Sequence, residues 1–404
     1  MVYIKLYFYR HKDKNGQPYM DVLRLIGVVI IEYPIYLLSS KYDYSRFWNK
    51  CIQINTLYTK VMQAVAIQYM SNEHCFYFNN IPYTSKEIQP IEYLTPSKVI
   101  GSGMISIVYE ATDEQGKIYV IKTKRKGIDE KVMNGLQQIK NIIRWMKYLP
   151  YSYIFNIDFI FNQIEYMMIE QLSFENEIKN HKRFKLNMEY TTDIIVPDIY
   201  DEYCTSTQIV MSKIEGEHYT SFSDEVRSQY AKKLVEMSAK NLILDGFIHS
   251  DLHAGNIIFT PDHKIGIIDF GLMIQLTSKD RQTFFDALKQ FAVHDYGKAV
   301  DIIIAEFIGP DTIKKSLSSS EYTRLHNTFQ IVLYTIYSVN KSFTIKDVHN
   351  VIQIVNTYKL NISNCFYNLM IFIVSCECLI KELSPLYIEI FMEKIKILAE
   401  FDTE

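Results

Sequence analysis

The stretch FIHSDLHAGNIIFTPDHKIGIIDFG, residues 247–271, carries the pattern that decides the fold. Asp251 lies five positions before Asn256, and Asp269 opens a DFG tripeptide after a short apolar segment. The apolar segments on both sides of the turn at 260–264 are predicted to form a β-hairpin, whose rigidity would fix Asp269. The loop before this hairpin would then bring three oxygen-bearing side chains to one site.

The spacing of Asp251, Asn256 and Asp269 is typical of phosphoryl-transfer enzymes. In kinases, an aspartate of the catalytic loop orients the acceptor, while an asparagine and the DFG aspartate hold magnesium. Magnesium prefers hard oxygen ligands in a tight octahedron. Each residue alone could be an ordinary turn or cap residue. Their combined order predicts a catalytic role for Asp251 and magnesium binding by Asn256 and Asp269.

A second pattern, KVIGSGMISIVYEATDEQGKIYVIKTK at 98–124, predicts a glycine loop that leads into a β-hairpin. Gly101 and Gly103 would let the backbone fold over phosphates and offer N–H groups to them. Val108 would pack on an adenine ring, although Ser106 stands where kinases have a third glycine. A plain tight turn is the alternative interpretation of the two glycines.

Lys122 ends the second strand of this hairpin, so its ammonium would return towards the glycine loop. An ammonium at that place neutralises phosphate oxygens and needs a carboxylate to orient it. Glu130 and Glu177 are the two candidate partners. An exposed lysine and solvated glutamates on helices are the alternative interpretation.

The composition indicates a globular protein with a large core. The chain has 404 residues, and its net charge of −3 gives no electrostatic support for nucleic-acid binding. Its six cysteines lack a metal-site or disulfide spacing and are predicted to be reduced thiols. The N-terminus lacks the features of a signal or transit peptide, so an intracellular location, cytoplasmic or at a membrane surface, is expected.

Two apolar stretches, at 25–38 and 369–380, raise the question of a membrane span. Both are interrupted by charged residues and are shorter than the roughly 20 apolar residues that a span needs. Buried helices are the favoured interpretation of both stretches. Peripheral membrane association remains an open alternative for the first.

The order of predicted elements indicates an α+β, two-lobed protein-kinase-like fold. Residues 1–96 are expected to form a helical N-terminal extension that ends in a proline-containing linker. Residues 97–214 would form an N-lobe with a helical insertion, and residues 215–404 a mostly helical C-lobe with the catalytic loop and the DFG. Periodicity predicts helices at 131–148, 161–185, 226–244, 281–293 and 384–399, and short strands at 193–196 and 208–211.

The run AKKLVEMSAKNLILDGFIHSDLHAGNIIF with IGIIDFGLM, together with VIKTKRKGI, QLSFENEIKNHKRF and VMSKIEGEHY, resembles the UbiB/AarF family of atypical kinases. The resemblance extends over most of the chain. It implies ATPase activity and a link to quinone or lipid metabolism. In that family the lysine-pairing glutamate lies in a helix well after the lysine, which favours Glu177 over Glu130 as the partner of Lys122.

The chain departs from the family pattern at several positions. Residues 60–63 (KVMQ) correspond to the KxGQ signature but lack its glycine, and residues 171–173 (QLS) lack both carboxylates of the ExD motif. Ala254 replaces a proline, and residues 101–104 (GSGM) replace an alanine-rich nucleotide loop. In the family the KxGQ extension packs over the site of a protein substrate, so these changes count against the same occlusion here.

The expected function is Mg-ATP binding followed by phosphoryl transfer or ATP hydrolysis, including serine/threonine protein kinase activity. ATP and Mg²⁺ are the expected cofactors, and the acceptor would be a protein, a lipid or a small molecule. A small-molecule kinase of the aminoglycoside or choline type shares HSDLHAGN and IIDFG, but the long helical insertion before Glu177 argues against it. A pseudokinase scaffold without turnover is the other alternative. His249 is expected to support the catalytic loop through hydrogen bonds.

Overall fold

The computed structural model describes residues 81–146, 157–340 and 342–384, together with isolated positions before residue 81. The chain divides into two compact units. The first takes in Gly101–Ile107 and Lys124–Met168, and the second takes in Pro90–Ile100, Val108–Thr123 and the chain from Ile169 onward.

Some predictions fall outside the described residues. They are the KxGQ-like residues Lys60 and Gln63, most of the predicted N-terminal extension, and nearly all of the predicted helix at 384–399. The expected domain boundaries after residues 96 and 214 stay predictions.

A four-stranded sheet contains the first predicted hairpin. Its strands are β1 Thr95–Ser102, β2 Ser106–Thr112, β3 Ile118–Lys124 and β5 Gln208–Ser212, in the order β1-β2-β3-β5. β3 and β5 are antiparallel, with Lys122 opposite Ile209. Gly116, at the turn between β2 and β3, has a φ of 80°, a conformation that glycine adopts without steric cost. The predicted hairpin and the strand predicted at 208–211 are therefore confirmed.

The helices between β3 and β5 correspond to the predicted insertion. They are α5 Ile128–Met146, α6 Ile157–Leu172 and α7 Phe174–Asn187. Ile128, Val132, Leu136 and Ile139 of α5 are buried at helical spacing. The segment 161–185 is mainly helical, as predicted, and it contains parts of two helices, because Ser173 ends α6 and caps α7 by accepting a hydrogen bond from the backbone N–H of Asn176.

Two small sheets, one of two strands and one of three, contain the segments on either side of the catalytic loop and the DFG. β6 Phe247–His249 pairs antiparallel with β9 Met273–Gln275. β7 Ile257–Phe259 pairs antiparallel with β8 Ile265–Ile267, which confirms the predicted hairpin. β4 Ile194–Ile195 runs parallel to β8. The catalytic loop therefore runs from β6 to β7 and the DFG from β8 to β9, so each is anchored at both ends.

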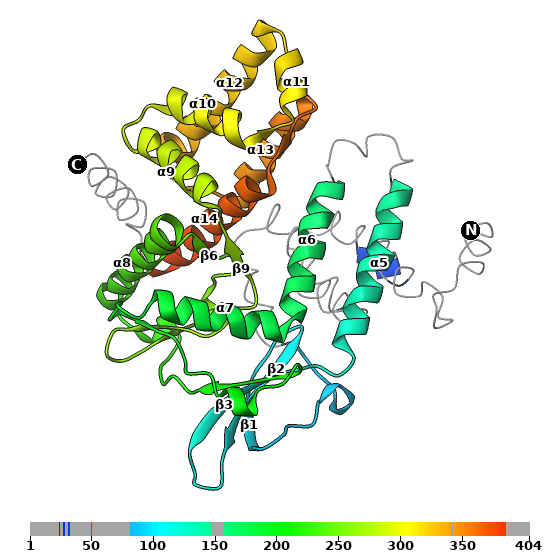
Figure 1. The fold of residues 1–404 in the computed structure, drawn as a ribbon, viewed down its shortest axis with the longest axis vertical. Helices are drawn as coiled ribbons and strands as arrows, with labels where there is room; N and C mark the ends of the chain where they lie inside the picture. The colour runs from blue at the N-terminus through cyan, green and yellow to red at the C-terminus, as the bar shows by residue number, and fades with distance from the viewer. Residues whose placement is uncertain are drawn as a thin grey trace, which may run out of the picture. The chain divides into compact units, whose positions relative to one another are not determined.

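The rest of the second unit is mainly helical, and Figure 1 shows α9, α10, α12, α13 and α14 gathered together. Its elements are α8 Asp224–Lys240, a π-helical turn Asn241–Asp245, α9 Ser278–Ala292, α10 Tyr296–Phe307, β10 Ile308–Gly309, α11 Asp311–Ser316, α12 Ser319–Tyr334, a π-helical turn Thr335–Asn340, α13 Ile345–Thr357, β11 Asn361–Ile362 and α14 Asn364–Leu383. The helices predicted at 226–244 and 281–293 are thus present, and the fold is α+β as predicted.

The apolar stretch at 369–380 lies within α14. One side of that helix is buried, and Glu377 accepts the backbone N–H of Phe343 with both carboxylate oxygens. Within the part of the chain that the structure describes, no helix has both the length and the apolar character that a membrane crossing requires. Cys376 is buried in the same helix and Cys378 is exposed, and neither of these two described cysteines forms a disulfide.

Candidate active site

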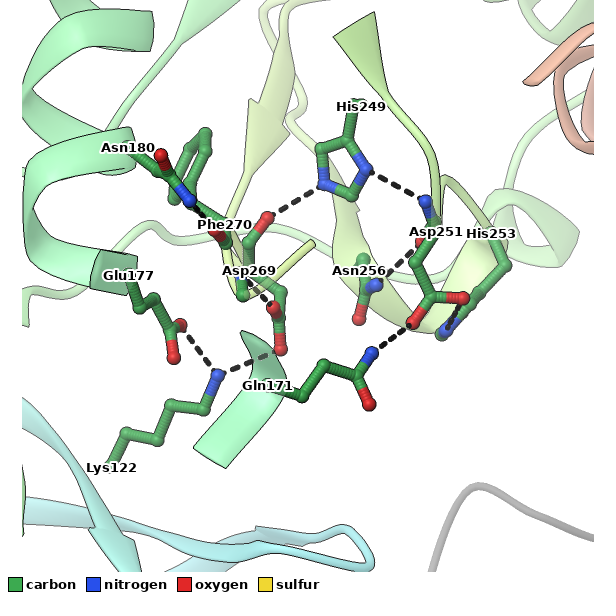
Figure 2. Close-up of polar contacts among 11 residues, drawn as sticks. Lys122, Gln171, Glu177, Asn180, His249, Asp251, His253, Asn256, Asp269 and Phe270 are labelled. Carbon is green, nitrogen blue, oxygen red and sulfur yellow. Dashed lines mark hydrogen bonds and ion pairs between the residues drawn. The ribbon is translucent and has the colours of Figure 1, made fainter. Parts of the chain in front are cut away.

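Lys122 is held by two carboxylates. Its ammonium nitrogen lies 2.5 Å from Glu177 Oε1 and 2.8 Å from Asp269 Oδ2, as Figure 2 shows. The lysine comes from β3, the glutamate from the first turn of α7 and the aspartate from the DFG after β8. The structure thus brings Lys122 to Glu177, the partner that the sequence favours.

Burial and charge together set the protonation of this cluster. Burial raises the pKa of Glu177 to about 6, and the Lys122 ammonium opposes that shift. Burial alone would lower the pKa of Lys122, but the two carboxylates outweigh it and hold this pKa above its ordinary value. Burial would also raise the pKa of Asp269, yet the same ammonium holds it well below its usual range. At neutral pH one ammonium therefore lies between two carboxylates.

One face of α7 contacts both Lys122 and the DFG. Glu177, Asn180, His181 and Phe184 follow one another at helical spacing. Asn180 Nδ2 donates to the backbone oxygen of Phe270 at 3.1 Å. The Phe270 ring is fully buried, with its centroid 4.4 Å from that of His181 and 5.2 Å from that of Phe184. The same helix therefore orients the lysine and fixes the backbone next to Asp269.

The glycine of the DFG is required by a close approach. The backbone N–H of Gly271 donates to Asp269 Oδ1 at 2.9 Å. A Cβ added to Gly271 would lie 3.2 Å from that oxygen and 3.7 Å from Glu177 Oε2. A side chain at this position would therefore crowd the Asp269 carboxylate, while its distance to Glu177 is an ordinary van der Waals contact.

Asp251 is held through its backbone and its side chain. Its N–H donates to His249 Nδ1 at 3.3 Å, and its carbonyl oxygen accepts from Asn256 Nδ2 at 2.8 Å. Its Oδ2 accepts from Gln171 Nε2 at 3.1 Å, while its Oδ1 lies 4.0 Å from His253 Nε2 (Figure 2). Four other residues thus surround Asp251, and the catalytic loop presents it in a defined orientation.

His249 links the catalytic loop to the DFG. Its Nε2 lies 2.7 Å from the backbone oxygen of Asp269, which can only accept, so Nε2 carries the proton. Its Nδ1 then accepts the N–H of Asp251. Burial lowers the pKa of His249, so the ring stays neutral. A neutral ring with its proton on Nε2 can donate to Asp269 and accept from Asp251 at the same time. The expectation that His249 supports the loop is confirmed.

Asn256 directly precedes β7, and Asp269 follows the end of the neighbouring strand β8. The N–H of Ile268 donates to the backbone oxygen of Asn256 at 3.1 Å, so the two predicted metal ligands are brought together across the hairpin. Because the side-chain nitrogen of Asn256 is bonded to Asp251, its side-chain oxygen points away from that carbonyl (Figure 2). An amide oxygen and a carboxylate are ligands that Mg²⁺ accepts.

A metal site made entirely of protein ligands differs from a site that phosphates and water complete. Among the residues that the structure describes, no three His, Cys, Asp or Glu side chains cluster so that they could hold a metal ion by themselves. Mg²⁺ usually takes one or two protein ligands and completes its shell with phosphates and water. The donor set at Asn256 and Asp269 fits that second type of site.

The glycine loop joins β1 to β2. Gly101 lies in β1, one residue before its end, and Gly103 directly follows that strand; both belong to the first unit. The N–H of Gly103 donates within the loop to the backbone oxygen of Ser106 at 2.9 Å. The predicted contacts of the two glycines with phosphates stay a prediction. The buried guanidinium of Arg125 donates to Gly103 O at 3.0 Å and fixes the turn. Val108 is half-buried in β2, in the second unit.

Two residues that contact the site were not singled out as functional from the sequence. Asn180 lies three positions after Glu177, so helical spacing could have placed it on the same face. In the sequence, Gln171 stands out only because it lacks the carboxylate of the ExD motif. Its contact with Asp251 depends on where α6 ends, and periodicity did not predict the break at Ser173.

The comparisons with known proteins agree with this geometry. A family model described as "ABC1 atypical kinase-like domain" matches residues 94–303, a range that includes every residue of the site. The chain is 28% identical over 262 residues to "Uncharacterized protein in hydrogenase 1 5'region" of Clostridium pasteurianum, which covers 61% of this chain and 49% of that protein.

Two relatives with informative names match a similar region. "Probable protein kinase UbiB" of Enterobacter sp. (strain 638) is 27% identical over 231 residues, 53% of this chain and 42% of that protein. "Protein ACTIVITY OF BC1 COMPLEX KINASE 3, chloroplastic" of Arabidopsis thaliana is 26% identical over 223 residues, 52% of this chain and 31% of that protein. The chain spans less than half the length of these three relatives.

Proposed function

Because the chain belongs to the ABC1 atypical kinase-like family, as the UbiB/AarF resemblance predicted, we propose that it binds Mg-ATP and transfers or hydrolyses the γ-phosphoryl group. One observation carries the proposal: Lys122 is ion-paired to both Glu177 and Asp269. Asp251, held in the same part of the second unit, would complete the catalytic set. Serine/threonine protein kinase activity is the finer form of this proposal.

Each residue has a proposed role. Lys122 binds phosphate oxygens, and Glu177 keeps its ammonium oriented. Asn256 and Asp269 are the residues that would hold magnesium, which neutralises phosphate charge when bound. Asp251 orients the attacking hydroxyl or water and accepts its proton. The protein forms no covalent bond to the phosphate, so positioning and charge supply the rate.

The nucleotide contacts proposed for Gly101, Gly103 and Val108 rest on the sequence pattern. The acceptor is proposed to be a protein, a lipid or a small molecule.

The test separates binding from turnover. We expect purified protein to consume ATP only with a divalent cation, and Asp251→Asn to keep its Mg-ATP affinity while losing at least about a hundredfold in kcat. Asp286→Asn, a change of an exposed carboxylate on α9, is the matched control and should behave as wild type. Wild-type turnover by Asp251→Asn would contradict the assigned role.

The same assay decides among the alternatives. Tight Mg-ATP binding without ATP consumption by any preparation would favour a nucleotide-binding scaffold. Labelled phosphate that appears on a small metabolite, and not on protein or lipid, would favour a kinase of the aminoglycoside or choline type.

A further inference from the structure

Arg125 is a buried arginine that joins two segments of the first unit. It directly follows β3, and its side chain is only 1% exposed. Its Nε donates to the backbone oxygen of Gly103 at 3.0 Å, and its Nη1 and Nη2 donate to the backbone oxygens of Pro82 and Ile81 at 3.0 and 2.8 Å. Nη2 also donates to the hydroxyl of Ser102 at 2.9 Å. One guanidinium therefore connects the glycine loop to the segment that precedes β1.

Backbone groups add to this connection. The N–H of Ile81 donates to the backbone oxygen of Ser102 at 2.8 Å, and the hydroxyl of Ser102 donates to the backbone oxygen of Ile81 at 2.7 Å. The N–H of Arg125 donates to the backbone oxygen of Ile105 at 2.7 Å. Arg125 thus contacts the loop at two further points along the chain, Gly103 through its side chain and Ile105 through its backbone.

We propose that Arg125 is a positioning residue for the nucleotide, because its guanidinium sets the shape of the glycine loop by tying the loop to residues 81 and 82. This inference rests on the proposed function, in which the backbone of the loop lies close to the phosphates. Among the residues that the structure describes, the atom nearest to a Cβ added at Gly103 would lie 3.8 Å away, so close packing does not fix the loop at this glycine. The hydrogen bonds of Arg125 supply a constraint there.

The guanidinium suits this position by its shape. It is planar and carries five N–H donors in a fixed fork, so it can bond carbonyl oxygens that lie in different directions. Glu87 Oε2 lies 3.5 Å from Nη1, which places a carboxylate near the buried charge. A loop of another shape would lose hydrogen bonds to this buried group, and such losses are costly. A lysine carries its three donors on one nitrogen and cannot replace Nε and Nη2 together.

The inference predicts a loss of affinity that depends on the phosphates. We expect Arg125→Met, which removes all the side-chain donors, to raise the Kd for Mg-ATP by about tenfold, on the scale of one hydrogen bond to a charged group. The Kd for adenosine should stay within about twofold, because adenosine has no phosphate for the loop to approach. Equilibrium titrations with the two ligands measure both constants. At saturating Mg-ATP the kcat should stay within about threefold, since the effect is on binding.

Two further variants complete the design. Lys126→Met removes a positive charge from the exposed neighbouring position and should bind both ligands as wild type does. Arg125→Lys keeps the charge and replaces Arg125→Met if that variant unfolds; it should also weaken Mg-ATP binding and leave adenosine binding unchanged. In either Arg125 variant the backbone amides of Ile81 and Gly103 should exchange their hydrogens faster than in wild type.

The outcomes separate this inference from the proposed function. An equal loss of affinity for Mg-ATP and adenosine, or wild-type affinity for Mg-ATP in Arg125→Lys, would overturn the positioning role while Mg-ATP binding by the wild type stands. Unchanged hydrogen exchange at Ile81 and Gly103 would overturn it as well. A wild-type protein that does not bind Mg-ATP would instead overturn the proposed function, and the inference with it.

Discussion

Lys122 meets two carboxylates in different surroundings, and the difference determines which one takes up a proton first. The side chain of Glu177 is 4% exposed, and burial raises its pKa to about 6. The side chain of Asp269 is 34% exposed, and the ammonium keeps its pKa low despite burial. As the pH falls, protonation therefore begins at Glu177, and Lys122 keeps Asp269 as its remaining partner.

This order of protonation predicts a pH dependence. The Mg-ATP affinity of the free protein should fall as the pH drops through about 6, because protonated Glu177 no longer orients Lys122. Nucleotide titrations at several pH values on both sides of 6 would measure it. Glu177→Gln should bind weakly at every pH and lack this acid limb; an acid limb unchanged from wild type would mean that another group titrates.

The same pKa affects stability in a defined direction. A carboxyl whose pKa is raised in the folded protein binds its proton more tightly there than in the unfolded chain. The contribution of Glu177 to the free energy of unfolding is therefore fully present below its ordinary value of 4.5 and declines as the pH rises to about 6. Denaturant unfolding of Glu177→Gln should lack this decline.

Replacement of Gly271 by alanine is expected to lower the turnover rate. In Gly271→Ala the new methyl group would lie 3.2 Å from Asp269 Oδ1 and should displace that carboxylate. We expect kcat to fall by roughly tenfold to a hundredfold, since small misplacements of catalytic groups have effects of that size. Gly297→Ala in α10 is the control, because its Cβ would meet nothing closer than 3.7 Å, and it should keep wild-type kcat.

Among the secondary-structure elements, α7 has the largest share in the site. Ser173 breaks the helical run and caps α7, which sets Glu177 in the first turn of the helix and leaves Gln171 at the end of α6. Periodicity predicted helix on both sides of residue 173 but not the break. The signal was local, because a serine before an acidic first turn is typical of a helix N-terminus.

Because α7 contacts both Lys122 and the backbone of the DFG, we expect a change on this helix to affect both stability and turnover. Asn180→Ala removes the hydrogen bond to the backbone of Phe270 and should lower the free energy of unfolding by about 1 kcal/mol. It should also lower kcat more than it changes the Kd for Mg-ATP, because Asp269 adjoins Phe270. Lys179→Ala, at the exposed neighbouring position, is the control for both measurements. Wild-type stability and kcat in Asn180→Ala would show that the bond has no role in holding the DFG.

Over the whole chain, the sequence predicted the features that depend on short, continuous segments. The hairpin of β7 and β8 follows from apolar runs around a turn, and the spacing of Asp251, Asn256 and Asp269 follows from that hairpin. Contacts between segments that are distant in the sequence could be predicted less well. The pairing of Glu177 with Lys122 was predicted from a family resemblance. The contact between Gln171 and Asp251 joins residues 80 positions apart, and no local sequence pattern indicates it.

Bound nucleotide should stabilise the whole folded chain. A ligand at a hundred times its Kd adds about 2.7 kcal/mol to the free energy of unfolding, so the melting temperature should rise when ATP and Mg²⁺ are present together. Removal of the cation with a chelator should abolish most of the rise. Asp269→Asn should show little dependence on the cation at all, whereas a rise equal to that of wild type would exclude Asp269 as a ligand.

The most direct measurement is a crystal structure of the protein with a non-hydrolysable ATP analogue and Mn²⁺, which anomalous scattering locates. We expect a manganese peak within about 2.2 Å of the side-chain oxygens of Asn256 and Asp269, with the triphosphate beside Lys122. A peak bound to neither residue, or a triphosphate distant from Lys122, would contradict this expectation.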